Sequence, residues 1–214
     1  MDKPEHSAEE YLPPRISIPA MRKAVQECQG CELYKNATQA VFGRGNVKAA
    51  VMFVGEQPGD VEDRNGKAFS GPSGNLLMAA LQESGIDPAT VYFTNAVKHF
   101  GFQERGKRRL HKKPRILDIR ACRPWLEAEI GTVQPAVIVC LGSSATVSVA
   151  GRSYKVTEMR GKFIATELAP QVMLTVHPAS ILRARPEDRE LQRKLFVNDL
   201  KKVAKYLRSM GEKT

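Results

Sequence analysis

The segment AAVMFVGE, residues 49–56, decides the fold. Its six apolar residues are enough for one buried strand, and they lead directly into a glycine and a carboxylate. Three further segments follow the same pattern: VYFTNAV at 91–97, AVIVCLG at 136–142 and QVMLTVH at 171–177. Nearly continuous apolar runs of this length are typical of strands that are covered on both faces, as in a parallel sheet. We therefore expect a mostly parallel central sheet of about four strands.

Helical periodicity separates these predicted strands. Apolar side chains recur on one face in three segments, 74–84, 116–130 and 143–150, and a last amphipathic helix begins at Pro186. Strands that alternate with helices predict an α/β protein, here a three-layer α/β/α sandwich. We expect a single domain over residues 18–214, preceded by a loosely ordered N-terminal segment, residues 1–17.

The composition is that of a soluble globular protein, with 42% hydrophobic and 26% charged residues in a chain of 214. No window reaches the ~18 apolar residues that a membrane span requires, and the first residues lack the apolar core of a secretory signal. We expect a cytoplasmic protein without a membrane partner. In a reducing compartment its four cysteines are more often metal ligands, reactive groups or buried thiols than disulfides.

The most basic part of the chain is RGKRRLHKKPR, residues 105–115, which has seven Lys or Arg residues and no acid. This run supplies most of the formal net charge of +10, and its charges cannot be buried without partners. A solvated loop or a localisation signal would explain it, but its field would also attract the phosphates of a nucleic acid. His111 lies within the run. Like charges favour its neutral imidazole, which is a nucleophile or a base, so we expect chemistry here as well as DNA binding.

Polar residues follow the predicted strands, where the carboxyl ends of a parallel sheet meet at a crevice. They are Glu56 and Gln57, Asn95, Gly142 with Ser143, and His177. Taken singly, Asn95 has an alternative role as a helix cap and His177 as part of a turn. Taken together, the strand ends predict a ligand site. The glycine-rich turn that follows Glu56 lacks the lysine of a phosphate-binding loop, which excludes a nucleotide cofactor.

Two residues suggest what the ligand is. Phe69 lies in a polar loop with glycines on both sides, where its ring is available to stack on a flat heterocycle. The side-chain amide of Asn95 has both a donor and an acceptor, which match N3–H and O4 of uracil and mismatch cytosine.

Four motifs carry a resemblance to a known family: GEQPGDVED at 55–63, KAFSGPSG at 67–74, TNAVKH at 94–99 and HPASILR at 177–183. In order and spacing they resemble the family 4 uracil-DNA glycosylases of the uracil-DNA glycosylase superfamily, over about residues 24–207. The KRRLH segment is absent from ordinary family 4 members and resembles the UdgX branch. Members of that branch bind uracil in DNA and become covalently joined to it through the histidine of this loop, which is His111 in this sequence.

The resemblance implies a role for each crevice residue. Uracil is flipped out of the DNA stack onto Phe69 and read by Asn95 and by backbone groups around Gly55 and Gln57. His177 stabilises the leaving uracil anion at O2. Glu56 orients His111 and accepts its proton, while His111 joins C1′ of the deoxyribose in a single turnover. Five further residues are expected to contact DNA: Lys107, Arg108, Arg109, Ser180 and Arg183.

Two other functions remain open from the sequence. One is an ordinary multiple-turnover uracil-DNA glycosylase that releases free uracil, and the other is a DNA-binding module without catalysis. We expect uracil-containing DNA as the partner, with single strands preferred, and a monomeric protein. Asp60 and Asp63 are either solvated acids or partners of arginines in the basic run.

The cysteines suggest a metal centre. Cys28 and Cys31 form a C-x-x-C pair suited to an iron-sulfur cluster or zinc, and a redox dithiol fits poorly because no strand precedes the pair. Cys122 and Cys140 would complete four thiolates, although Cys140 lies in the middle of a predicted buried strand. The family resemblance instead implies a 4Fe-4S cluster held by Cys28, Cys31, His99 and Cys122. Cys140 is then a core thiol.

Overall fold

The computed structural model describes residues 7–106 and 108–211, and a parallel sheet lies at its centre. Its four parallel strands are β2 (Val51–Gly55), β3 (Tyr92–Asn95), β6 (Val137–Leu141) and β8 (Gln171–Thr175), in the order β3-β2-β6-β8. The predicted, mostly parallel sheet is confirmed. It has six strands rather than about four, because β1 (Arg44–Gly45) and β7 (Phe163–Ile164) pair antiparallel at its two edges. Strands of two residues have no alternation that a sequence pattern could reveal.

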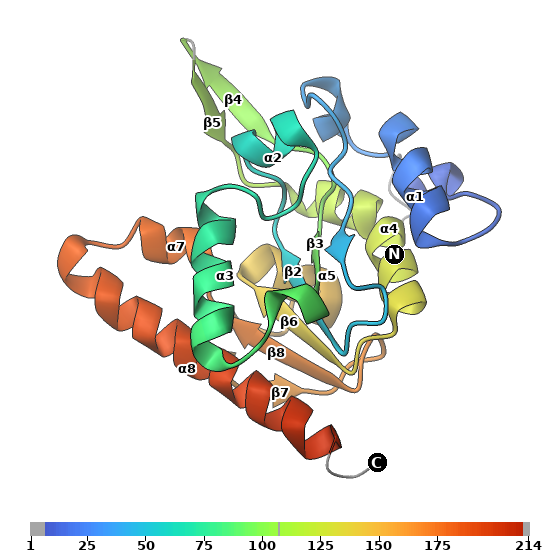
Figure 1. The fold of residues 1–214 in the computed structure, drawn as a ribbon. Coiled ribbons are helices and arrows are strands. Elements are labelled where there is room, and N and C mark those ends of the chain that lie inside the picture. The colour runs from blue at the N-terminus through green and yellow to red at the C-terminus, as the bar shows by residue number, and fades with distance from the viewer. Residues whose placement is uncertain (1–6, 107, 212–214) are drawn as a thin grey trace.

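Helices cover both faces of the sheet (Figure 1), which confirms the three-layer sandwich. One face packs against α3 (Pro72–Ser84), α7 (Pro178–Leu182) and α8 (Pro186–Gly211), and the other against α1 (Ile18–Ala24), α4 (Ile116–Val133) and α5 (Ser143–Ala150). Residues of β2 alternate between the two layers, since Met52 and Val54 face the α4 side and Phe53 faces the α8 side. The strands are therefore buried on both faces, as their apolar runs predict.

The remaining elements are short. Two helices, α2 (Asp60–Asn65) and α6 (Val156–Met159), follow β2 and α5, and four 3-10 helices complete the set: η1 (Ala8–Tyr11), η2 (Val25–Glu27), η3 (Glu32–Lys35) and η4 (Pro88–Thr90). Ala8 in η1 is buried, and η1 contacts α4. The division of the chain at residue 17 stays a prediction. No helix in the described ranges is long and apolar enough to cross a membrane.

The first turns of α8 differ from the expected amphipathic pattern. Leu200 and Val203 are buried, but Leu191 and Leu195 are 56% and 40% exposed. Helical spacing alone does not show where a helix extends past the layer that it covers.

The basic run forms a β-hairpin rather than a loop. Strands β4 (Phe102–Arg105) and β5 (Arg108–His111) pair antiparallel and project from the sandwich beside α2 (Figure 1). Lys107, which the sequence places between these two strands, lies outside the described residues. The sequence does not predict these two strands, because four of their eight residues are Arg or His and no apolar alternation is visible. The hairpin continues through residues 112–115 into α4, which belongs to the layer that also contains α1 and α5.

Candidate functional site

A crevice of about 820 Å³ opens beyond the carboxyl ends of the parallel strands. It is lined by residues that the sequence singles out at all four strand ends, namely Glu56 and Gln57, Asn95, Gly142 with Ser143, and His177. Phe69, His111, Ser180 and Arg183 also line it. The structure therefore brings the sequence-predicted site residues of the crevice together around one hollow.

The floor of the crevice depends on a glycine at the end of β2. A Cβ atom at Gly55 would lie 2.3 Å from Asn95 Oδ1 and 2.7 Å from Phe69 Cζ, so a larger residue would displace both. Phe69 adopts a positive φ of 53° and tilts against Phe93, with 5.8 Å between the ring centroids. Its ring thus belongs to the core as well as to the crevice wall. Because Gly55 has no side chain, the Phe69 ring and the Asn95 amide can both lie against it at the crevice floor.

Glu56 connects the sandwich to the hairpin. His111 Nε2 lies 3.2 Å from Glu56 Oε1, and Ser144 Oγ donates to Glu56 Oε2 at 2.5 Å. Burial by itself would raise the pKa of Glu56, but hydrogen bonds from His111 and Ser144 hold this pKa below its usual range. Glu56 is therefore ionised at neutral pH, with one carboxylate oxygen toward His111.

Unlike the Glu56 carboxylate, the side chain of His177 is uncharged at neutral pH. Burial lowers the pKa of His177 to about 4, and the nearby Arg183 and His111 act in the same direction, against the opposing effect of the Glu56 carboxylate. The backbone N–H of Ala179 donates to His177 Nδ1 at 3.1 Å at the start of α7. Because Nδ1 accepts, the neutral ring must carry its proton on Nε2. His177 is thus a neutral imidazole that lines the crevice with one N–H donor.

Arg109 attaches the hairpin to α2. Arg109 Nε lies 2.5 Å from Asp60 Oδ1, and Arg109 Nη1 lies 2.6 Å from Asp63 Oδ2. Its guanidinium also lies 4.9 Å from the Phe102 ring centroid. Asp63 is fully buried and accepts hydrogen bonds from Thr38, so it is not a solvated acid. Arg109, expected to contact DNA, is therefore engaged by two carboxylates of the protein.

The side chain of Gln57 holds the base of the hairpin. Its Nε2 donates to the backbone oxygens of Gly101 and Lys112, and its Oε1 accepts from the N–H of Gly101. Gly101 and Lys112 are the residues directly before and after the two strands. The side-chain amide of Gln57 is therefore engaged by the hairpin, and the ligand contact expected from its backbone stays a prediction.

Of the other expected DNA contacts, Ser180 and Arg183 line the crevice, whereas Arg108 lies in β5 of the hairpin. Arg108 is exposed, and Ser180 Oγ donates to the backbone oxygen of His177 at 2.7 Å. Lys113, after the hairpin, donates to Ser143 Oγ at 3.1 Å across the crevice mouth. Arg183 lines the same rim. Cationic and hydroxyl groups thus surround the opening from both sides.

The four predicted cluster ligands do not line the crevice and are nearly inaccessible to solvent. Their exposed fractions are 5% for Cys28, 5% for Cys31, 4% for His99 and 3% for Cys122. Cys31 Sγ is 4.0 Å from His99 Nδ1, and the thiols of Cys31 and Cys28 act electrostatically on that of Cys122. Burial raises the pKa of Cys31 to about 11 and lowers that of His99 to about 4. Three thiols and an imidazole therefore gather in one buried region.

These donors suit an iron-sulfur cluster in their chemistry, since thiolates and an imidazole are its known ligands. Within the described residues, no group of three or more His, Cys, Asp or Glu side chains is arranged to hold a metal ion. Cys140 is fully buried in β6, and burial alone raises its pKa, without an effect of another thiol. This isolation is consistent with a core thiol.

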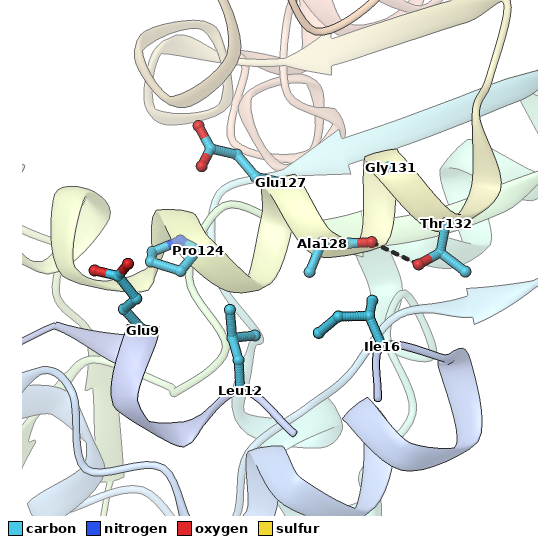
Figure 2. A pocket seen from close by; sticks show the side chains of 8 residues that line it. All are labelled: Glu9, Leu12, Ile16, Pro124, Glu127, Ala128, Gly131 and Thr132. Atoms are coloured by element: carbon cyan, nitrogen blue, oxygen red, sulfur yellow. Dashed lines mark hydrogen bonds between the residues drawn. The ribbon is translucent and has the colours of Figure 1, made fainter. Parts of the chain in front are cut away.

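A second hollow, of about 660 Å³, lies between the N-terminal segment and α4. Figure 2 shows Leu12 and Ile16 facing Pro124 and Ala128 of that helix. This second hollow is lined by no residue that the sequence predicts to be functional. The crevice at the strand ends is therefore the candidate site.

Comparison with known proteins agrees with this geometry. A family model described as the uracil DNA glycosylase superfamily matches residues 42–201. The chain belongs to the uracil-DNA glycosylase superfamily. Its relatives include the type-4 uracil-DNA glycosylase of Thermotoga maritima, which is 35% identical over 188 residues, 87% of this chain and 93% of that protein. Those of Pyrobaculum aerophilum and Sulfurisphaera tokodaii are 32% and 33% identical, over 84% and 87% of this chain and 92% and 83% of those proteins.

In this member of the superfamily, sequence alone does not single out Ser144. It is 2% exposed and donates to Glu56 from the first turn of α5. Two adjacent serines follow the strand end, and no pattern indicates which of them turns inward. The pairing of Asp60 and Asp63 with Arg109 was one of two alternatives that the sequence left open, and it is the correct one.

Proposed function

We propose that this protein excises uracil from DNA and is then captured covalently by its product through His111. Membership of the uracil-DNA glycosylase superfamily and the names of its relatives support the excision. One observation carries the capture: His111 Nε2 lies 3.2 Å from Glu56 Oε1 at the crevice, on a hairpin that is attached to the sandwich. The protein would thereby act in DNA repair.

Recognition follows from the crevice floor. A flipped uracil stacks on the crevice edge of Phe69, and the amide of Asn95 pairs with N3–H and O4 of the base. The backbone around Gly55 and Gln57 contacts the remaining polar atoms. Cytosine presents the opposite donor and acceptor to the same amide, which leaves buried polar groups unpaired and disfavours it.

Cleavage breaks the bond between N1 of uracil and C1′ of the sugar, and the electron pair of that bond leaves with the base. The neutral His177 donates a hydrogen bond from its Nε2–H to O2, where negative charge develops. A preorganised donor of this kind lowers the barrier by about 3 kcal/mol. The ionised Glu56 lies on the same crevice and stabilises the positive charge that develops on the sugar.

Capture completes the reaction. An unprotonated ring nitrogen of His111 donates its electron pair to C1′ and forms a carbon–nitrogen bond. Glu56 accepts the proton that the imidazole loses, so the product is a neutral alkylated imidazole and a protonated carboxyl. Such an imidazole is a poor leaving group, which makes the reaction a single turnover. If water reached C1′ first, the same crevice would release uracil in multiple turnovers.

We further propose that Cys28, Cys31, His99 and Cys122 hold a 4Fe-4S cluster. When bound, the cluster would cross-link the segment between η2 and η3, the loop after β3, and α4, and it would supply rigidity rather than a redox step. The chain's own residues already meet there, since the N–H of Lys98 donates to Cys122 Sγ and Trp125 Nε1 donates to Cys28 Sγ. We expect the protein to be a monomer that prefers single-stranded DNA.

One gel tests the proposed function. The protein is incubated with single-stranded and double-stranded DNA that contains one uracil, then heated in detergent. A shifted band that survives, strongest with single strands, is the expected result. An alkali-labile abasic site without a shifted band would instead identify a multiple-turnover glycosylase, and intact DNA a binding module without catalysis.

A further inference from the structure

We propose that Ser144 is the positioning residue that makes Glu56 effective, because it fixes one carboxylate oxygen and thereby turns the other toward His111. This inference rests on the proposed function. It assigns a role to a residue that touches neither DNA nor the reacting atoms, and whose effect passes through Glu56.

The geometry assigns different partners to the two oxygens of Glu56. Oε2 accepts from Ser144 Oγ, and Oε1 faces His111 Nε2. A carboxylate with one partner can rotate about its last bond and exchange its oxygens, whereas a second, fixed partner opposes that rotation. Ser144 is suited to be the fixed partner, because it is 2% exposed in α5 while the His111 side chain is 47% exposed on the hairpin.

The hydrogen bond also acts on the charge of Glu56. A hydroxyl that donates to a carboxylate stabilises the ionised form, which is the form that can accept a proton from His111. The other charged or titratable groups that face this part of the crevice are His111, His177, Asp60, Glu62, Lys113 and Arg183. Glu62 and Asp60 are carboxylates that accept from Gly59, Gly71 and Arg109, so neither can replace Ser144 as a donor. Lys113 can donate, but its Nζ donates to Ser143 Oγ.

The chain contains a matched control on the same helix. Ser148 is also 2% exposed in α5, but its Oγ has no hydrogen-bond partner among the described residues. Replacing Ser144 or Ser148 by alanine removes the same atom from the same helix, and only the first replacement deprives Glu56 of a donor.

The test is the single-turnover rate of adduct formation from pH 5 to pH 8 for the wild type, Ser144→Ala, Ser148→Ala and the conservative Ser144→Thr. A hydrogen bond to a charged group is lost in Ser144→Ala, so we expect about a tenfold lower rate at pH 7. The pKa of Glu56 should rise without this donor, which moves the acid limb of the profile to higher pH. Ser148→Ala should match the wild type, and Ser144→Thr should restore much of the rate.

Superimposable profiles for Ser144→Ala and Ser148→Ala would overturn the inference. Should Ser144→Ala fail to fold, Ser144→Cys keeps the volume with a weaker donor and carries the same expectation, with Ser148→Cys as its control. A wild type that forms no adduct at any pH would instead refute the proposed capture itself, so the two failures are distinguishable.

Discussion

His111 leaves 47% of its side chain exposed on the hairpin, whereas Cys122, on the helix that follows the hairpin, is 3% exposed. The hairpin is attached to the sandwich by the ion pairs of Arg109 and by the side-chain amide of Gln57, whereas the region that contains the three thiols is almost completely buried. Here we call residues 101–112 the capture hairpin, and Cys28, Cys31, His99 and Cys122 the ligand cluster.

The difference predicts that stability and product choice are separable in this molecule. Most side chains of the capture hairpin are exposed, and of the two ion pairs of Arg109 only that with Asp63 involves a fully buried carboxylate, whereas buried donors that share a bound ligand contribute much to folding. Substitutions in the capture hairpin should therefore change which product forms, and substitutions in the ligand cluster should change whether the sandwich is stable. Each prediction below tests this separation.

The largest effect is expected from Cys122→Ala. Loss of one of the four proposed ligands should abolish iron binding and the visible absorbance of the proposed cluster, and should lower the midpoint of thermal unfolding. Cys140→Ala, in a buried strand without another thiol that acts on it, is the control and should retain the iron. Loss of iron in Cys140→Ala but not in His99→Ala would contradict the ligand set.

His111→Ala should reduce the heat-stable adduct by about 100-fold or more, because it removes the proposed nucleophile. Uracil release should continue, as water takes the place of the imidazole at C1′. Denaturing gels measure the adduct and alkaline cleavage measures the abasic site. Leu110→Ala is the control, since Leu110 is the neighbouring exposed hairpin residue. A persistent adduct in His111→Ala would show that another residue is the nucleophile.

His177 sharpens the comparison, because it lines the crevice and yet burial controls its pKa. Its pKa of about 4 in the folded protein lies below 6.5 in the unfolded chain, so the unfolded state binds more protons between these values. Stability should therefore fall as the pH is lowered through this window, by roughly 2 kcal/mol from this residue. Denaturant unfolding at pH 7 and pH 4.5 measures it against His177→Asn. An equal loss in both proteins would contradict the assignment.

Asp63→Asn should give the smallest of the four effects, about a tenfold loss of adduct, through weaker attachment of Arg109 and the capture hairpin. The rate of uracil release should change less, since release does not require the hairpin. Asp60→Asn is the matched comparison, because Asp60 is 42% exposed while Asp63 is fully buried. Equal effects of the two substitutions on the adduct would indicate that burial of the ion pair does not matter.

Much of the fold could be predicted from the sequence, because buried parallel strands produce apolar runs that end at polar residues. The four central strands and the layers of helices are confirmed. The edge strands β1 and β7 could not be predicted, since two residues carry no period. The hairpin could not be predicted because charge, rather than alternation, dominates its sequence.

The candidate site was predictable as a set of strand ends, but its contacts were not. Glu56, Asn95 and His177 follow strands, and topology alone brings them to one crevice. The inward turn of Arg109 depends on its partner Asp63, 46 residues earlier in the chain. Similarly, Ser144 reaches Glu56 across 88 residues, and a sequence pattern contains no signal for such a contact.

The central claim is a bond between His111 and C1′ of a deoxyuridine site. Peptide mass spectrometry of the heat-stable adduct, after digestion of the protein and the DNA, tests it most directly. We predict that the sugar-phosphate mass is carried by the peptide that contains His111, with fragment ions that place it on that residue. A modification on any other residue, or an unmodified His111 peptide at full yield, would contradict the account.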